Sequence, residues 1–225
     1  MKSHPLKIGI LSIQGAFLEH INVLTGLSDE YNLNIIEVKT SQQLHHVDGL
    51  ILPGGESTTM ALIAKTSDLF DELVKFVHNP NKIVWGTCAG LIFLSSEISY
   101  AKIGGQDLLK ALKVKVSRNA FGKQLGSFST QLKVPCLLEP EKYFPAVFIR
   151  APIVESIDEN SKTIEVLAYL ENLDAKRVRG INHVEGEKII VAVRQDNIIA
   201  TSFHPELTRD DRFHRFFLEL VKEKV

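Results

Sequence analysis

Short apolar runs alternate with amphipathic segments through the first half of the chain. Runs of about four to eight apolar residues bounded by turn residues are typical of buried strands, and apolar spacings of three and four residues are typical of helices. We therefore expect strands at 7–13, 35–38, 49–52 and 82–85. We expect helices at 17–27, from 57 or 58 to about 77, and from just after residue 88 to about 95.

Two of these helices have an apolar face that the spacing defines. The faces consist of Phe17, Ile21, Leu24 and Leu27 in the first helix, and of Leu62, Leu69, Leu73 and Phe76 in the second. Ser57 or Thr58 is the expected N-cap of the second helix, because a hydroxyl there can accept a backbone N–H. The alternation of strand and helix predicts a parallel sheet with helices on both faces.

The second half of the chain is different, because strand-like runs follow one another with turns between them. Three prolines within 135–145 predict an irregular surface loop. No linker or repeat divides the chain, so we predict one domain over residues 1–225. Its expected fold is α/β, with a central, mostly parallel sheet flanked by helices and extra antiparallel strands. We expect strands at 114–117, 127–134, 146–149, 163–170, 188–194 and 198–203, and turns at 172–180 and 185–186. We expect a closing helix at 210–221, with an apolar face of Phe213, Phe216, Phe217 and Leu220.

Composition excludes several classes of function. The 225 residues include 26 basic and 27 acidic side chains, a balance that does not suggest binding to nucleic acid or to an anionic membrane. No apolar run reaches the length of a membrane span, and the N-terminus lacks the apolar core of a signal peptide. The two cysteines are far apart, without metal-ligand spacing. We expect a soluble, cytoplasmic protein with no metal site and no cofactor.

The stretch Trp85-Gly-Thr-Cys-Ala-Gly90 is the most informative in the chain. Cys88 has a glycine two residues away on each side and stands between an apolar run and an expected helix. This is the sequence form of a nucleophile elbow, a strand-to-helix turn so sharp that side chains at the glycine positions would collide. The N-terminus of the following helix would favour the thiolate. The alternative is a buried structural cysteine, as most free cysteines are.

A thiol nucleophile needs a base, and the base needs a group that orients it. His204 is the candidate base because it follows an apolar run, and strand ends are where α/β folds place functional groups. Glu206 is close enough along the chain to contact the far nitrogen of His204. The alternative is a surface histidine in a proline turn. The other histidines, including His20 near the end of an expected element, show no distinguishing pattern.

A third segment, Pro53-Gly-Gly-Glu-Ser57, ends an expected strand and precedes a helix. Its Gly-Gly turn exposes backbone N–H groups, which could stabilise the oxyanion of a tetrahedral intermediate. A phosphate cradle is the alternative, although the Lys-Ser/Thr ending of a P-loop and the third glycine of a dinucleotide-binding motif are both missing.

Together these three segments resemble the class I, or triad, glutamine amidotransferases, in which the cysteine of Gly-x-Cys-x-Gly attacks the amide of glutamine. Further motifs narrow the resemblance to the glutaminase subunits of pyridoxal 5′-phosphate synthase, and they follow the family order from about residue 7 to 221. The motifs are Leu11-Ser-Ile-Gln-Gly-Ala-Phe-Leu-Glu-His20, Leu52-Pro-Gly-Gly-Glu-Ser-Thr-Thr-Met60, Gly86-Thr-Cys-Ala-Gly-Leu-Ile92, Arg118-Asn-Ala-Phe-Gly122, Phe148-Ile-Arg-Ala-Pro152 and Phe203-His-Pro-Glu-Leu-Thr208.

The resemblance implies a flavodoxin-like fold and a glutaminase that passes ammonia to a separate synthase subunit in a large hetero-oligomer. L-Glutamine is the implied substrate, with Cys88 as nucleophile, His204 as base and Glu206 as the orienting carboxylate. The other implied site residues are Gly55, Glu56, Ser57, Arg118, Ile149 and Arg150 for substrate binding, the N–H groups of Gly55 and Ala89 for the oxyanion hole, and Gln14 for coupling to the partner. Arg and Glu suit the carboxylate and ammonium of an amino acid. The alternative for Arg118 and Arg150 is a solvated surface charge.

The chain departs from the family pattern mainly around the motifs. Ser12 replaces a small apolar residue, and Leu125-Gly126 replaces a more polar pair. The segments 135–145 and 172–188 look longer than in compact bacterial members. These departures affect the edges of the partner interface rather than the chemistry.

Two rival functions stay open from the sequence. The first is another triad hydrolase on the same fold, such as a peptidase, against which the motifs at 118–122 and 148–150 argue. The second is a subunit that docks on a synthase and no longer catalyses, against which the intact Cys, His and Glu set argues. Cys136, in a Pro-flanked apolar stretch, is expected to be structural.

Overall fold

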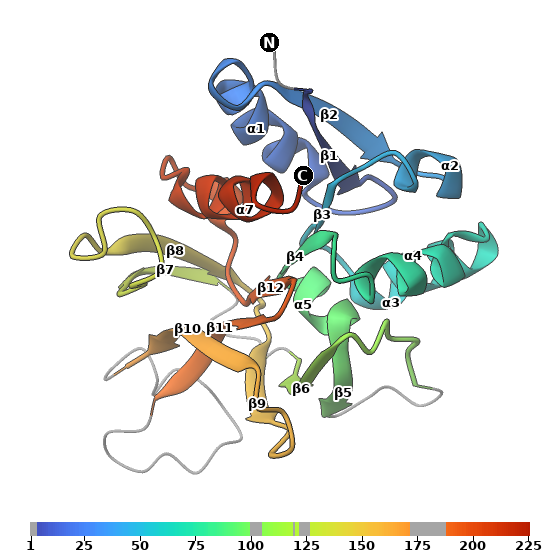
Figure 1. Cartoon of the computed structure of the whole chain (residues 1–225). Coiled ribbons are helices and arrows are strands. Elements are labelled where there is room, and N and C mark those ends of the chain that lie inside the picture. Colours follow the sequence, from blue (N-terminus) through green and yellow to red (C-terminus); the bar gives the residue numbers. More distant parts are fainter. Residues whose placement is uncertain (1–3, 100–104, 119, 122–126, 172–187) are drawn as a thin grey trace.

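The computed structural model describes residues 4–99, 105–118, 120–121, 127–171 and 188–225, shown as coloured ribbon in Figure 1. The turns expected at 172–180 and 185–186, and the pair at 125–126, lie outside the described residues. The helices are α1 (Phe17–Tyr31), α2 (Ser41–Leu44), α3 (Ser57–Thr66), α4 (Leu69–Val77), α5 (Ala89–Leu94), the 3₁₀ helix η1 (Pro205–Leu207) and α7 (Arg212–Lys222). The strands are β1 (Leu6–Leu11), β2 (Leu33–Val38), β3 (Gly49–Leu52), β4 (Ile83–Thr87), β5 (Ser95–Ser99), β6 (Leu112–Ser117), β7 (Ser127–Leu132), β8 (Phe144–Ile149), β9 (Ile153–Ile157), β10 (Ile164–Leu170), β11 (Ile189–Gln195) and β12 (Ile198–Thr201).

The main sheet has the strand order β2-β1-β3-β4-β12-β11-β9-β6-β5, and β10 also pairs with β11. Every pairing from β2 to β12 is parallel. Beyond β12 the sheet continues through antiparallel pairings of β11 with β12, β10 and β9, and of β9 with β6. Strands β7 and β8 form a separate antiparallel pair. The predicted α/β fold, a mostly parallel sheet with helices and extra antiparallel strands, is confirmed.

Alternate residues of the central strands face two hydrophobic clusters, one on each side of the sheet. In β4, Trp85 belongs to one cluster and Val84 to the other, as the two-residue period of a strand requires. Leu24 of α1 and Phe217 of α7 pack in the first cluster, and Leu73 of α4 packs in the second. Figure 1 accordingly shows α1 and α7 together on one side of these strands and α3 and α4 on the other.

The single helix expected from residue 57 or 58 to about 77 is wrong, because the chain forms two helices, α3 and α4, in that region. Asp68 between them has a φ of +53°, a left-handed conformation that interrupts a right-handed helix. The break changes the helical phase. Leu62, expected on one face with Leu69, is therefore 63% exposed, whereas Leu69 is fully buried.

The N-terminal cap of α3 also differs from the prediction. Glu56, rather than Ser57 or Thr58, is the cap residue, and its carboxylate accepts the backbone N–H of Thr59 at 2.8 Å. Ser57 is instead buried as the first residue of the helix. The Glu56 carboxylate is thereby held at the start of α3, where negative charge is favourable.

The sequence did not predict four of the described elements, α2, β5, β9 and η1. Strand β5 reads Ser-Ser-Glu-Ile-Ser and has no apolar run. It is a strand because its backbone pairs with β6. Strand β9 is short and follows Pro152, but it pairs with both β6 and β11. Tertiary pairing, which no local pattern reports, decides these assignments.

Candidate active site

Cys88 occupies the turn between β4 and α5, with backbone dihedrals of φ +49° and ψ −98°. Such a conformation is strained for any residue with a side chain, and strained residues cluster at functional sites. The residue is only 6% exposed. This is the backbone geometry of the nucleophile elbow that the sequence indicated.

Gly86 and Gly90 make the turn possible. A Cβ on Gly86 would lie 2.6 Å from the carbonyl carbon of Gly90, and a Cβ on Gly90 would lie 2.1 Å from the carbonyl oxygen of Leu52. Both are contacts with backbone, which cannot move aside as a flexible side chain can. The elbow therefore depends on glycine at both positions for steric reasons.

Strand β12 brings the candidate base to the thiol. It lies beside β4 in the sheet, and the backbone N–H of Cys88 donates to the carbonyl of Thr201 at 2.8 Å. His204, just beyond the strand, and Cys88 both adjoin Gly54, where an added Cβ would lie 2.3 Å from Cε1 of His204 and 3.4 Å from Cβ of Cys88. Nδ1 of His204 lies 2.7 Å from Oε1 of Glu206. The side chain of His204 is 8% exposed, and that of Glu206 is fully buried. The structure thus joins Cys88, His204 and Glu206 in one chain of contacts.

The surroundings of His204 favour its protonated form. Burial by itself lowers the pKa of this imidazole, but hydrogen bonds to Cys88 and Glu206, and the charges on those partners, outweigh burial and raise the pKa to about 10. An imidazolium beside a thiol stabilises the thiolate. The protonated ring can therefore serve as a proton donor beside the sulfur at neutral pH.

The Gly54–Gly55 turn packs directly against these groups. A Cβ on Gly54 would lie 2.3 Å from Cε1 of His204 and 3.4 Å from Cβ of Cys88. The backbone N–H of Ala16 donates to the carbonyl of Gly54 at 2.9 Å. Because carbonyl and N–H point in opposite directions across a trans peptide, this bond fixes the direction of the Gly55 N–H.

Gln14, in the loop after β1, contacts the same turn. Its Oε1 accepts the backbone N–H of Glu56 at 2.8 Å, and a Cβ on Gly55 would lie 2.2 Å from that oxygen. Gln14 is therefore in contact with the segment that carries one of the two expected oxyanion donors. Ala89, the other expected donor, opens α5 directly after Cys88.

Arg118 and Glu56 form an ion pair at the start of α3. Nη2 of Arg118 donates to Oε1 of Glu56 at 3.0 Å, and Nη1 donates to Oε1 of Gln106 at 3.1 Å. The Ser57 hydroxyl donates to the same Gln106 oxygen at 3.1 Å. Burial would raise the pKa of Glu56, but hydrogen bonds from Thr59 and its neighbour lower it to about 2. The cluster therefore carries one fixed cation and one fixed anion at neutral pH.

Gln106 was not singled out from the sequence. Its Oε1 joins Arg118 to the first turn of α3, while its Nε2 is buried without a hydrogen-bond partner among the described residues. A lone glutamine in an irregular segment carries no pattern that could have identified it. Asn119 and Gly122, from the same motif as Arg118, lie outside the described residues.

The end of β8 reaches the thiol. Sγ of Cys88 lies 3.9 Å from the carbonyl oxygen of Ile149. Arg150 follows with a φ of +46° and is exposed. The structure therefore brings Ile149 to Cys88 and leaves the Arg150 side chain on the surface beside it.

Two buried histidines lie behind Glu206, and the sequence pattern did not identify either as functional. Nε2 of His20, in α1, lies 3.4 Å from Oε2 of Glu206, and Nδ1 of His20 lies 3.0 Å from Nε2 of His214 in α7. Burial lowers the pKa of His214 to about 3; burial and the neighbouring histidines also lower the pKa of His20. One sequence feature could have indicated that His20 is buried: it stands one helical turn before Leu24, on the apolar face of its helix.

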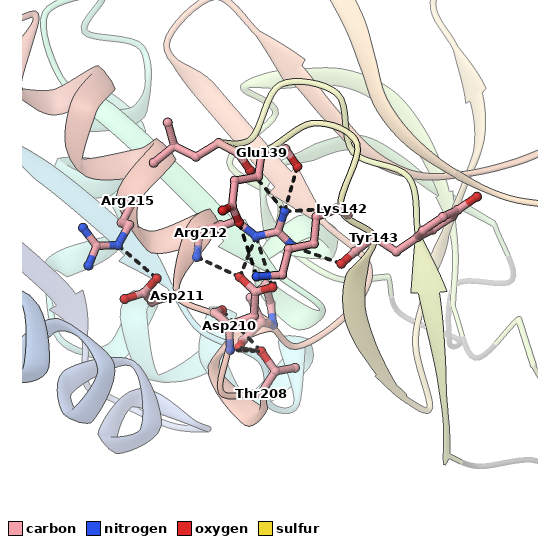
Figure 2. A network of polar contacts seen from close by, with 10 residues as sticks. Glu139, Lys142, Tyr143, Thr208, Asp210, Asp211, Arg212 and Arg215 are labelled. Carbon is pink, nitrogen blue, oxygen red and sulfur yellow. Dashed lines mark hydrogen bonds and ion pairs between the residues drawn. The ribbon is translucent and has the colours of Figure 1, made fainter.

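The loop after Glu206 is anchored by Arg212 at the start of α7 (Figure 2). Nε and Nη2 of Arg212 donate to the Asp210 carboxylate at 2.9 and 2.7 Å. The remaining N–H groups donate to backbone carbonyls of the loop predicted at 135–145, and the side chain is 7% exposed. The network therefore ties Asp210 and the start of α7 to that loop. The four carbonyls belong to Leu138, Glu139, Lys142 and Tyr143.

The second cysteine, Cys136, lies in a different environment. Burial, together with the charge of Glu165, raises the pKa of this free thiol to about 11, which agrees with a structural role. In the described part of the chain, no group of three or more His, Cys, Asp or Glu side chains could hold a metal ion. No helix among the described residues is long and apolar enough to cross a membrane.

Comparisons with known proteins place these features in a family. A curated relative from Dehalococcoides mccartyi, pyridoxal 5′-phosphate synthase subunit PdxT, is 43% identical over 97% of this chain and 98% of its own length. Pyridoxal 5′-phosphate synthase subunit SNO1 of Saccharomyces cerevisiae is 44% identical over 94% of this chain and 91% of its own. A solved structure described as a glutamine amidotransferase is 39% identical with a TM-score of 0.77, covering 96% of this chain and 98% of that one. The model of the SNO glutamine amidotransferase family matches residues 10–223, and the chain belongs to that family.

Proposed function

We propose that this protein is the glutaminase subunit of a pyridoxal 5′-phosphate synthase. It hydrolyses L-glutamine to L-glutamate and ammonia, and it delivers the ammonia to a separate synthase subunit for vitamin B6 biosynthesis. The observation that carries the proposal is the chain of contacts from Cys88 through His204 to Glu206 at the elbow, in a member of this family. The relatives named as subunits of that synthase support the choice of partner.

The first half of the reaction forms a thioester. The Cys88 thiolate attacks the amide carbon of glutamine, so that a C–S bond forms and the carbonyl electron pair moves onto oxygen. The N–H groups of Gly55 and Ala89 stabilise this oxyanion. The His204 imidazolium then gives its proton to the amide nitrogen, the C–N bond breaks, and ammonia departs.

The second half releases glutamate. His204, now neutral, accepts a proton from water as the water oxygen attacks the thioester carbon. The same backbone N–H groups hold the second oxyanion. The C–S bond breaks, glutamate leaves, and the imidazolium and thiolate are restored. Glu206 keeps Nδ1 of His204 protonated and the ring oriented throughout, because the two groups are 2.7 Å apart.

The ends of the substrate are held by the charged cluster at α3. Arg118 pairs with the carboxylate of glutamine and Glu56 with its ammonium, which are the complementary charges that a free amino acid presents. Gly55, Ser57 and the end of β8 at Ile149 and Arg150 complete the pocket around the side-chain amide. The existing Arg118–Glu56 ion pair, at 3.0 Å, supports this assignment because it holds both charges near the elbow.

Coupling to the partner is assigned to Gln14. Its contacts with Gly55 and with the N–H of Glu56 place it against one oxyanion donor, so a synthase subunit that contacts this loop would act on that donor. The proposed assembly is a large hetero-oligomer in the cytoplasm. A reducing compartment would keep Cys88 as a free thiol.

The test is glutamate release from L-glutamine by the purified chain, alone and with a cognate synthase subunit. Activity that is low alone and rises with the partner supports a coupled ammonia donor, and Cys88→Ala should abolish it. High activity that the partner leaves unchanged points to an independent hydrolase. Activity in neither case favours a non-catalytic docking subunit, and cleavage in a peptide screen would favour a peptidase.

A further inference from the structure

Behind the proposed triad, the contacts continue into the core through two histidines. Oε1 of Glu206 faces His204, and Oε2 lies 3.4 Å from Nε2 of His20. That nitrogen is also 3.3 Å from Oγ1 of Thr87, and Nδ1 of His20 is 3.0 Å from Nε2 of His214. Glu206, His20 and His214 come from η1, α1 and α7, and all three side chains are buried.

We propose that His20 is a positioning residue for the proposed glutaminase reaction, holding Glu206 as an oriented carboxylate by presenting an N–H at Nε2, with His214 fixing that tautomer. His20 acts through Glu206 and touches neither substrate nor the reacting sulfur. The inference rests on the proposed function only for its effect on turnover, because the tautomer itself can be observed without any substrate.

The first argument is electrostatic. Burial keeps both histidines neutral, so the His20 ring carries one N–H and one lone pair. A lone pair at Nε2 would face the buried carboxylate oxygen and repel it, whereas an N–H there attracts it. At 3.4 Å the contact is a charge–dipole interaction and not a hydrogen bond, since Oε2 has no hydrogen-bond partner among the described residues. With the proton on Nε2, the hydrogen bond at 3.3 Å between that nitrogen and Oγ1 of Thr87 has Thr87 as its acceptor.

The second argument is the hydrogen-bond inventory of His214. Its Nδ1 is buried and has no hydrogen-bond partner among the described residues. If His20 donated from Nδ1, His214 would accept at Nε2 and carry its own proton on that unpaired Nδ1, leaving a buried donor unsatisfied. If His214 donates from Nε2, the unpaired atom is only an acceptor. Both arguments therefore select the tautomer with N–H at Nε2 of His20.

This arrangement leaves Glu206 dependent on two rings on opposite sides. His204 contacts Oε1 from the loop after β12, and His20 contacts Oε2 from α1. Without the N–H of His20, Oε2 would be a buried carboxylate oxygen facing an apolar or empty site, which favours rotation of the carboxylate away from His204. Turnover would fall because the imidazole loses its fixed orientation, while the glutamine pocket at α3 stays intact.

The experiment compares His20→Leu, which removes the N–H, with His20→Gln, whose amide can donate from a similar position. We expect kcat with the partner subunit to fall roughly tenfold or more in His20→Leu, with KM for glutamine nearly unchanged, and to recover largely in His20→Gln. Alkylation of Cys88 by iodoacetamide needs neither glutamine nor partner. It should be slowed in His20→Leu and largely restored in His20→Gln. Leu73→Ala, a buried change in the opposite core cluster, controls for lost stability.

Equal losses in His20→Leu and His20→Gln, or a loss in His20→Leu no larger than in Leu73→Ala, would overturn the proposal. If His20→Leu does not fold, nitrogen NMR of the wild-type imidazoles decides the question alone. The proposal requires a neutral His20 with N–H at Nε2, and an N–H at Nδ1 would refute it. Because neither NMR nor alkylation involves glutamine, failure of the glutaminase assignment would be seen separately.

Discussion

Gly54 and His204 are in such close contact that a Cβ on Gly54 would lie 2.3 Å from Cε1 of the imidazole. Gly54→Ala is therefore expected to displace the ring from Cys88. A displacement on the order of 1 Å can cost about 100-fold in rate, so we expect a loss of that size in kcat for glutamine hydrolysis. Steady-state kinetics with the partner subunit measures it.

Gly26 in α1 offers a matched control, because a Cβ there would meet nothing within 4 Å. Gly26→Ala should leave kcat unchanged and raise the free energy of unfolding by about 0.5–1 kcal/mol. Wild-type kcat in Gly54→Ala would show that the position of His204 seen here does not matter for turnover.

The raised pKa of His204 predicts how this ring titrates. With a pKa of about 10, the imidazole stays protonated through neutral pH and loses its proton only as the pH rises toward that value. In Cys88→Ala the hydrogen bond and charge of the thiol are gone, so the pKa of His204 should fall. NMR titration of the ring protons measures both values. An unchanged titration in Cys88→Ala would contradict the pairing.

Arg118→Gln should separate binding from chemistry. The substitution removes the charge proposed to hold the carboxylate of glutamine, a charge-assisted contact of about 1.5–3 kcal/mol, and KM should rise roughly 10- to 100-fold with a much smaller change in kcat. Arg215→Gln is the control, because Arg215 also pairs with carboxylates, Glu30 and Asp211, but in α7. A KM that rises equally in both variants would point to a general loss of structure.

The neutral, buried His214 predicts a weakness at acid pH. Its pKa is lowered to about 3, whereas in the unfolded chain it is about 6.5, so the unfolded state binds the extra proton first. The stability that His214 contributes is therefore complete above pH 6.5 and is lost as pH falls from there toward 3. His214→Leu should lose less free energy of unfolding over this range than the wild type does. Denaturant titrations at several pH values measure the two slopes, and parallel slopes would be the contrary result.

Among the described arginines, Arg212 is expected to be the most costly to replace. Arg212→Met would remove the guanidinium from Asp210 and from four loop carbonyls, and we expect the free energy of unfolding to fall by about 3 kcal/mol. Arg209, three residues earlier and exposed, provides the control, for which Arg209→Met should change stability by less than about 0.5 kcal/mol. Denaturant unfolding of both variants tests this, and similar losses would contradict the anchoring role.

Local pattern was sufficient for the elements whose burial is periodic. The apolar faces of α1 and α7 and the runs of β1, β3 and β4 pack as their spacing indicated, because one face of each element meets the core. The break at Asp68 was missed because the apolar spacing from Leu62 to Leu69 fits an unbroken helix equally well. A residue in the left-handed conformation does not alter the spacing of apolar residues along the sequence.

The residues of the candidate site also differ in whether the sequence alone could identify them. Cys88 and its two flanking glycines could be identified because a tight turn imposes local steric demands. His20 could not, because its significance comes from Glu206 and His214, which stand far from it in the chain and meet it only in the folded core. Gln106 is similar, since its contacts with Arg118 and α3 are all long-range.

Strand β12 lies between β4 and β11 in the sheet, although about half of the chain separates it from β4. During synthesis, the thiol of Cys88 leaves the ribosome long before the strand that must pair beside it. Until then the edge of β4 is unpaired, a surface that attracts other strands and that a chaperone would have to cover. The proposed glutaminase site therefore cannot assemble in a nascent chain until the chain is almost fully translated.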